Sequence, residues 1–84
     1  MERKVFWSDE DLRHRLRRVE GQIRGIEAMV GRVESCNDIL VQLAATQGAL
    51  GKIVKIVEAC RVAEKLVGDI ADPAMVREVL GRLV

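Results

Sequence analysis

Three features of this 84-residue chain predict an all-α fold of three helices. Hydrophobic residues make up 49% of the chain but aromatic residues only 2%, so aliphatic side chains carry most of the apolar content. Apolar residues recur at alternating steps of three and four along two long stretches, which is the spacing of a helix that buries one face. The single proline is residue 73, so no proline interrupts either stretch. We expect residues 1–84 to form one domain.

The first helix is expected from residue 9 to about residue 32. Ser8 supplies a capping hydroxyl, and the acidic residues at 9–11 suit the positive end of the helix dipole. We expect Trp7 to pack onto this helix as a hydrophobic staple. The apolar seam of the helix is formed by Leu12, Leu16, Val19, Ile23, Ile26, Val30 and Val33.

The second helix is expected from residue 36 to about residue 67, with Ser35 as its cap and Gly68 as its stop. A short third helix, from residue 73 to about residue 83, begins at Pro73, which suits the first turn of a helix. The seam of the second helix again alternates steps of three and four. It consists of Cys36, Ile39, Leu43, Thr46, Leu50, Ile53, Val57 and Cys60.

The length of the second helix predicts self-association. A helix of about 32 residues is roughly 48 Å long, whereas a compact chain of this size has a radius of gyration of about 12 Å. Small residues lie around the midpoint of the seam and allow two helix backbones to approach closely. We therefore expect an antiparallel helical-bundle dimer that crosses near Gly48, with Cys36 opposite Cys60 of the partner subunit. The small residues are Ala44, Ala45, Gly48 and Gly51.

A basic stripe lies beside the first seam, although the whole chain carries 14 basic and 13 acidic residues. Between residues 12 and 25 only Glu20 opposes the arginines, so the positive charge is local, as phosphate binding requires. We expect His14 to add a phosphate contact. From the charges alone, a solvated helix surface is an equal alternative. The arginines are Arg13, Arg15, Arg17, Arg18 and Arg24.

The segment from Leu12 to Gly25 contains the run His14-Arg15-Leu16-Arg17-Arg18-Val19-Glu20-Gly21-Gln22-Ile23-Arg24-Gly25. This segment resembles the signature of the copper-sensitive operon repressors, the CsoR/RcnR family. The similarity continues through Cys36 and the segment Gln42-Leu43-Ala44-Ala45-Thr46-Gln47-Gly48-Ala49-Leu50. The resemblance implies antiparallel dimers paired into a tetramer, a dimer of dimers. It also implies DNA binding without a helix-turn-helix, and release of the operator when an effector reaches Cys36.

The same resemblance places the family's DNA-contacting basic positions on Arg15 and Lys52. Neighbouring basic side chains belong to the same stripe and are expected to contribute. The complete set of expected DNA-binding residues is Arg13, His14, Arg15, Arg17, Arg18 and Lys52.

The chain departs from the copper-sensing members of that family. In those members, the cysteine that corresponds to Cys36 binds a cuprous ion together with a histidine and a cysteine of the partner subunit. Arg61 and Lys65 occupy those two positions here. Cationic groups repel a cuprous ion, so the usual copper site cannot assemble. The histidines of nickel and cobalt sensors are also absent, so no particular cofactor is indicated, although a metal ion stays open. An alternative metal site would combine Cys36 with Cys60, Glu58 or Glu64 of the partner subunit.

Thiol chemistry is the interpretation that remains. Cys36 lies in the first turn of a helix, where the dipole favours a thiolate, and Arg61 or Lys65 of the partner subunit would add to this effect. We expect a transcriptional repressor that is released when a persulfide or another electrophile modifies Cys36. Cys60 is either a second sensing thiol or a small buried hydrophobic residue. The alternatives are a metal-responsive repressor and a structural homologue without an effector.

Other classes of protein are not indicated. No nucleophile, base and orienting group recur together, so we do not expect an enzyme. The N-terminus lacks a signal-peptide core, and no apolar run approaches the roughly 20 residues that span a bilayer. We therefore expect a cytoplasmic protein whose partners are double-stranded DNA and further copies of itself, and no membrane.

Overall fold

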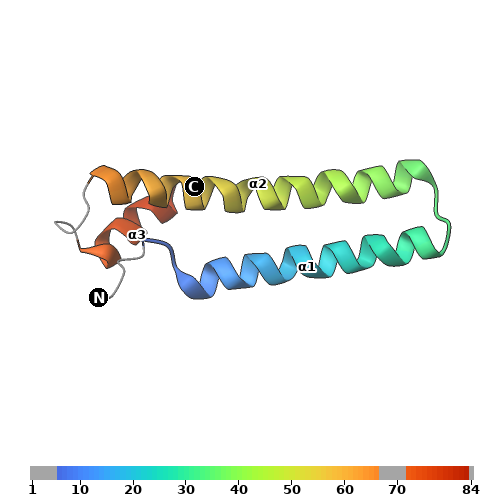
Figure 1. Ribbon diagram of the computed structural model, residues 1–84, viewed down its shortest axis with the longest axis horizontal. Helices are drawn as coiled ribbons and strands as arrows, with labels where there is room; N and C mark the ends of the chain where they lie inside the picture. The colour runs from blue at the N-terminus through green and yellow to red at the C-terminus, as the bar shows by residue number, and fades with distance from the viewer. Residues whose placement is uncertain (1–5, 67–71, 84) are drawn as a thin grey trace.

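The computed structural model describes residues 6–66 and 72–83, which form three α-helices and no strand. These are α1 (Asp9–Gly31), α2 (Cys36–Leu66) and α3 (Pro73–Leu83) (Figure 1). The all-α prediction is confirmed, and each of these bounds lies within one residue of its expected position. The expected stop at Gly68 lies outside the described residues.

Each helix begins at a side chain that caps it. The hydroxyl groups of Ser8 and Ser35 each accept a backbone N–H three residues further on, at 3.3 and 3.2 Å. The carboxylate of Asp72 accepts the N–H of Ala74 at 3.1 Å. These contacts satisfy amide groups that have no partner inside the helix, which explains why the starts were predictable from local sequence.

The connection between α1 and α2 is a tight turn. The N–H of Arg32 donates to the carbonyl of Ala28 at 3.0 Å, and the N–H of Glu34 donates to that of Met29 at 3.1 Å. Val33 adopts a φ of 57°, in the left-handed region, and is 87% exposed. Its assignment to the seam of the first helix is therefore wrong, because the helix has already ended and the side chain points to solvent.

The two long helices form an antiparallel hairpin, and α3 lies at the end of that hairpin where α1 begins and α2 ends (Figure 1). The molecule measures 54 × 23 × 17 Å, with a radius of gyration of 16.7 Å. A compact chain of this length has a radius of gyration of about 12 Å. One protomer is thus elongated, and the buried apolar side chains among the described residues are few: Phe6, Val19, Ile53 and Cys60.

Each predicted seam divides into two stripes with a period of seven residues. An inner stripe is half-buried or buried within the protomer, and an outer stripe is exposed although it is apolar. The inner stripe comprises Leu12, Val19, Ile26, Ile39, Thr46, Ile53 and Cys60. The outer stripe comprises Leu16, Ile23, Val30, Leu43, Leu50 and Val57.

Both helices contribute to an apolar groove of about 360 Å³ between the two stripes. Val19 and Thr46 form part of its base, while Ile23 and Leu50 are exposed on its sides. The one buried hydroxyl group, that of Thr46, donates to the carbonyl of Gln42 at 2.9 Å, so it carries no unsatisfied donor.

The segment before α1 packs differently from the prediction. Phe6 is only 1% exposed, whereas Trp7 is half-buried. Trp7 lies beside Arg77 of α3 as well as Asp9 at the start of α1. The expected staple residue is therefore shared between α1 and α3, and Phe6 is the aromatic side chain of the core.

By length and composition, α2 is the one helix in the described part of the chain that is long and apolar enough to cross a membrane. This corrects the expectation that no segment reaches that limit. Only 11% of its most apolar stretch is buried within the protomer, so most of that surface is uncovered. The core helix of a bundle meets the same criterion, and α2 places its inner stripe against α1.

Candidate nucleic-acid interface

Basic side chains from both long helices meet in a groove of about 210 Å³. Arg15 and Arg18 come from α1, and Lys52 comes from α2, which runs antiparallel to it. Gln22 and Ala49 complete the lining. We call these five residues the basic groove. It brings together three of the six predicted DNA-binding residues, including both positions that the family resemblance singled out.

The charges in the basic groove are available to a phosphate. The Nε of Arg15 pairs with the Oδ2 of Asp11 at 2.9 Å, and this arginine side chain is 34% exposed. Such a solvent-accessible pair is weak and can exchange partners. Among the described residues, Arg18 and Lys52 have no carboxylate partner. Guanidinium and ammonium groups in this arrangement suit the phosphates of a nucleic acid.

Gln22 adds a polar group that was not among the predicted site residues. Its amide oxygen is buried and accepts no hydrogen bond in the described structure. Buried acceptors in proteins are nearly always paired, so this oxygen is an exception among the described residues. Gln22 belongs to the signature segment, but only the contact between α1 and α2 places it beside Lys52.

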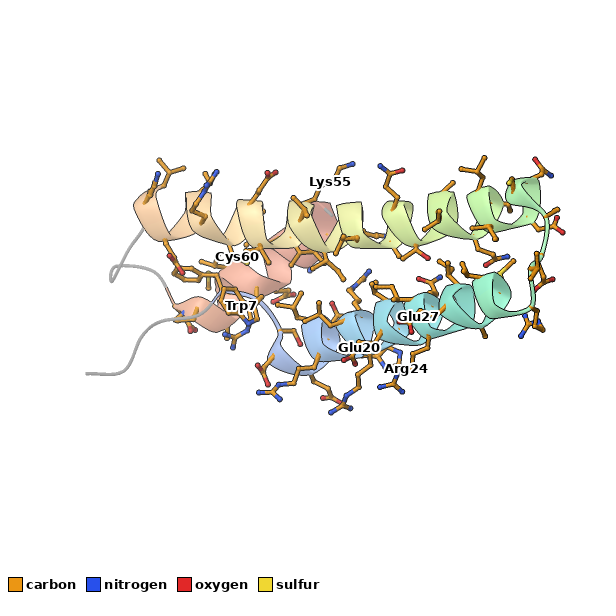
Figure 2. The ribbon with its side chains drawn as sticks, turned by 45° about the vertical axis from the view of Figure 1, so that its right-hand side comes forward. Trp7, Glu20, Arg24, Glu27, Lys55 and Cys60 are labelled. Atoms are coloured by element: carbon orange, nitrogen blue, oxygen red, sulfur yellow. The ribbon has the colours of Figure 1, made fainter. Side chains whose placement is uncertain are left out.

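The other three predicted residues lie outside the basic groove. His14 and Arg17 border a neighbouring hollow of about 400 Å³ at the start of α1, together with Glu10 and Asp11. Arg13 is exposed, and its Nε pairs with the Oδ2 of Asp9 at 2.8 Å. The predicted stripe is thus divided between the basic groove and the neighbouring surface of α1. Arg24, also in the stripe, points away from α2 (Figure 2).

The two cysteines occupy different environments. Cys36 is exposed at the first residue of α2, whereas Cys60 is 1% exposed. Figure 2 shows Cys60 beside Trp7, where α2, α3 and the segment before α1 meet. Burial, and secondarily the negative charge of Glu64, raises the pKa of the Cys60 thiol. Cys60 thus belongs to the inner stripe, whereas Cys36 is exposed like the residues of the outer stripe.

A cross-link between Cys36 and Cys60 of the partner subunit therefore requires more than two facing helices. The second thiol must first be uncovered, since it lies inside its own protomer. The cross-link stays a prediction, and the exposed Cys36 is the cysteine that a reagent meets first.

The residues do not fit the copper site implied by the family resemblance. Arg61 and Lys65, at the expected ligand positions, are both exposed cations. In the part of the chain that the structure describes, no three His, Cys, Asp or Glu side chains gather where one metal ion could bind them. Glu58 and Glu64 lie on the same helix as Cys60, at the other end of α2 from Cys36. A soft cation at that end of α2 would be repelled by the positive charges of Arg61 and Lys65.

The contrast in burial predicts the order in which the cysteines react. With iodoacetamide at pH 7.5, Cys36 should be alkylated at least about tenfold faster than Cys60, because a buried thiol with a raised pKa forms little accessible thiolate. Peptide mass spectrometry over time measures both rates. In denaturant the two rates should converge, and faster alkylation of Cys60 in the folded protein would contradict the assignment.

A groove lined by Arg15, Arg18 and Lys52 across two antiparallel helices is the kind of surface that suits an anionic polymer. Residues 8–83 match the family described as metal-sensitive transcriptional repressor. The chain belongs to this family, whose members repress transcription and are not enzymes. This confirms the resemblance to the CsoR/RcnR family.

Two curated relatives support that membership. The copper-sensing transcriptional repressor CsoR of Bacillus subtilis (strain 168) is 46% identical over 44 residues, which are 52% of this chain and 44% of the relative. The copper-sensing transcriptional repressor RicR of Mycobacterium tuberculosis (strain ATCC 25618 / H37Rv) is 49% identical over 39 residues, 46% of this chain and 41% of the relative. The match thus spans less than half the length of either relative. No solved structure matches this chain significantly.

Proposed function

We propose that this protein is a cytoplasmic repressor that binds operator DNA through the basic groove and is released when the thiol of Cys36 is modified. The single observation that carries DNA binding is the convergence of Arg15, Arg18 and Lys52 in one groove. Family membership supplies repression as the outcome of binding. Because phosphate contacts dominate such an interface, binding should be strongly dependent on salt.

The proposed DNA-binding form is an antiparallel dimer, and a dimer of dimers in the complete assembly. The outer stripe provides an apolar face on both long helices that one protomer leaves exposed. At Gly48 and Gly51 an added Cβ would meet nothing within 4 Å, so the backbone of α2 is open to a neighbouring helix there. Burial of the outer stripe in a second copy would complete the core that an 84-residue chain needs.

In this dimer the exposed Cys36 of one protomer faces the far end of α2 in the partner subunit. Arg61 and Lys65 are exposed on that end and would stabilise a thiolate. The thiolate attacks the outer sulfur of a low-molecular-weight persulfide. The S–S bond of the persulfide breaks, the donor leaves as its own thiolate, and Cys36 carries the transferred sulfur. The new group changes charge and volume at the dimer interface.

Metal sensing is the second candidate function, and the names of both curated relatives favour it. It would use Cys36 with Cys60, Glu58 or Glu64 of the partner subunit. The exposed cations at Arg61 and Lys65 oppose it. Thiol modification requires only Cys36, whose side chain is exposed in the protomer.

Release from DNA separates the two candidates. A duplex selected from a random pool serves as the operator, and fluorescence anisotropy measures its affinity under anaerobic conditions. Glutathione persulfide should weaken binding by about tenfold or more in the parent, a typical size for coupling between sites. Cys36→Ser should keep full affinity, and Cys60→Ser should respond like the parent. Release of the parent by cuprous ion alone, or unchanged release of Cys36→Ser by the persulfide, would refute thiol sensing at Cys36.

A further inference from the structure

The amide of Gln22 is a feature of the basic groove that phosphate binding alone does not explain. Its Oε1 is buried, and nothing in residues 6–66 and 72–83 donates a hydrogen bond to it. A buried acceptor without a donor destabilises the folded protein, because it has lost water and gained no partner. An apolar side chain of similar length at position 22 would avoid this cost.

The other polar side chains of the basic groove are all hydrogen-bond donors. Arg18 lies one turn before Gln22 on α1, and Lys52 reaches the groove from α2. Neither has a carboxylate partner within the described ranges. Arg15 differs from them, because its Nε already pairs with Asp11 at 2.9 Å. The Oε1 of Gln22 is therefore the one side-chain acceptor in the lining of the groove.

Lys52 is the donor that suits this oxygen best. An ammonium group has three donors on a flexible stem, so it can bind Gln22 and a phosphate at the same time. Ala49, three residues before Lys52, has a small side chain, and the groove is open beside it. The last torsion of a glutamine side chain is broad, so the amide can turn its oxygen toward the ammonium at little cost.

The positive charges of the groove explain why this contact is not made in the protein alone. Arg15, Arg18 and Lys52 line a volume of about 210 Å³. Moving the ammonium group inward brings it closer to two guanidinium groups, which repel it. A phosphate in the groove offsets that repulsion and accepts hydrogen bonds from the same cations. Bound DNA therefore favours the inward position of Lys52.

We propose that Gln22 is a positioning residue for DNA binding. In the complex its Oε1 accepts a hydrogen bond from the ammonium group of Lys52, and the same ammonium binds a phosphate. This inference rests on the proposed DNA-binding function. The unpaired oxygen destabilises the free protein, and its pairing stabilises the complex, so Gln22 strengthens binding without touching DNA.

Gln22→Met separates this role from a structural one, because methionine has a similar length and favours a helix. Without DNA, the variant should unfold at a temperature about 4 °C or more above that of the parent, since it removes an unpaired buried acceptor. Circular dichroism measures the midpoint, and Gln22→Leu should shift it in the same direction. An equal or lower midpoint in both variants would show that the oxygen is paired in the free protein, and would overturn the proposal.

The same variant should bind the selected duplex more weakly. Fluorescence anisotropy at low salt, where weakened variants still bind, should show a loss of about tenfold or more, the usual size for a hydrogen bond to a charged group. Gln42→Met is the matched control, because Gln42 is exposed on α2 and lies outside the groove lining. It should keep the affinity of the parent. A purely structural role of Gln22 would lower stability and affinity together, whereas the positioning role raises stability while it lowers affinity.

A double-mutant cycle identifies the donor. In a Lys52→Ala background, Gln22→Met should change affinity by less than about twofold, because the donor is already absent. In an Arg18→Ala background the loss of about tenfold should persist. The reverse pattern, or the full loss in both backgrounds, would show that Gln22 does not act through Lys52.

The affinity of the parent separates this inference from the proposed function. A parent that binds the duplex no better than Gln22→Met does would overturn the role of Gln22 and leave DNA binding intact. A parent that binds no duplex would overturn DNA binding and the role of Gln22 with it.

Discussion

Replacing Leu50 by Asp should convert the assembled protein into monomers that lose most of their helical structure. Leu50 is exposed in one protomer, yet it lies on the outer stripe and borders the apolar groove. In an antiparallel helix pair this position is buried, so the substitution removes an apolar side chain and buries a carboxylate. Large-to-small changes in a core cost about 2–5 kcal/mol, and burial of an unpaired charge costs more.

Loss of structure should accompany loss of assembly. The described part of one protomer buries only four apolar side chains, and its shape is elongated. We therefore expect this chain to fold together with its partner and to have no stable folded monomer. Sedimentation and circular dichroism at micromolar protein measure both effects.

Lys55→Asp is the matched control, because Lys55 lies on the same helix and points away from α1 (Figure 2). It introduces the same side chain without placing it on the outer stripe, and surface changes of this kind usually alter stability by less than about 0.5 kcal/mol. A Leu50→Asp variant that sediments like the parent and keeps its helicity would remove the outer stripe from the interface.

Local features of the fold could be predicted from the sequence. Ser8 and Ser35 act on amide groups three residues away, so their role as caps needs no information about distant parts of the chain. The periodic apolar residues likewise identified both long helices. The seam could not show which apolar positions face the same protomer, since inner and outer stripes have the same residue types. The structure is needed to show that Val19 is buried within the protomer whereas Ile23 is exposed.

Features that depend on contacts between distant segments were harder to predict from the sequence. The arginines of α1 were counted as one stripe, but successive helix positions turn by about 100°, which sends Arg13 and Arg15 in different directions. The membership of Lys52 in the site came from the family resemblance and not from charge or spacing. Phe6 was missed because a single aromatic residue ahead of a helix carries no periodic pattern. The cavity that Phe6, Cys60 and Leu80 line combines residues from distant segments of the chain, so no local motif indicates it.

The central claim is that the basic groove holds DNA phosphates. The double variant Arg15→Ala, Lys52→Ala removes both charges and leaves two residues that are compatible with helices. Its affinity for the selected duplex should fall by at least about a hundredfold, since each charge-assisted contact contributes about 1.5–3 kcal/mol. Lys55→Ala, which removes a lysine that points away from α1, should lower affinity far less.

The most direct measurement is the slope of the logarithm of the binding constant against the logarithm of the salt concentration. Each phosphate contact contributes about 0.9 to this slope. The double variant should therefore give a slope that is shallower than that of the parent by about two for each protomer that contacts the DNA, with its thermal unfolding unchanged. A double variant with the affinity and the salt slope of the parent would show that DNA is held elsewhere on the molecule.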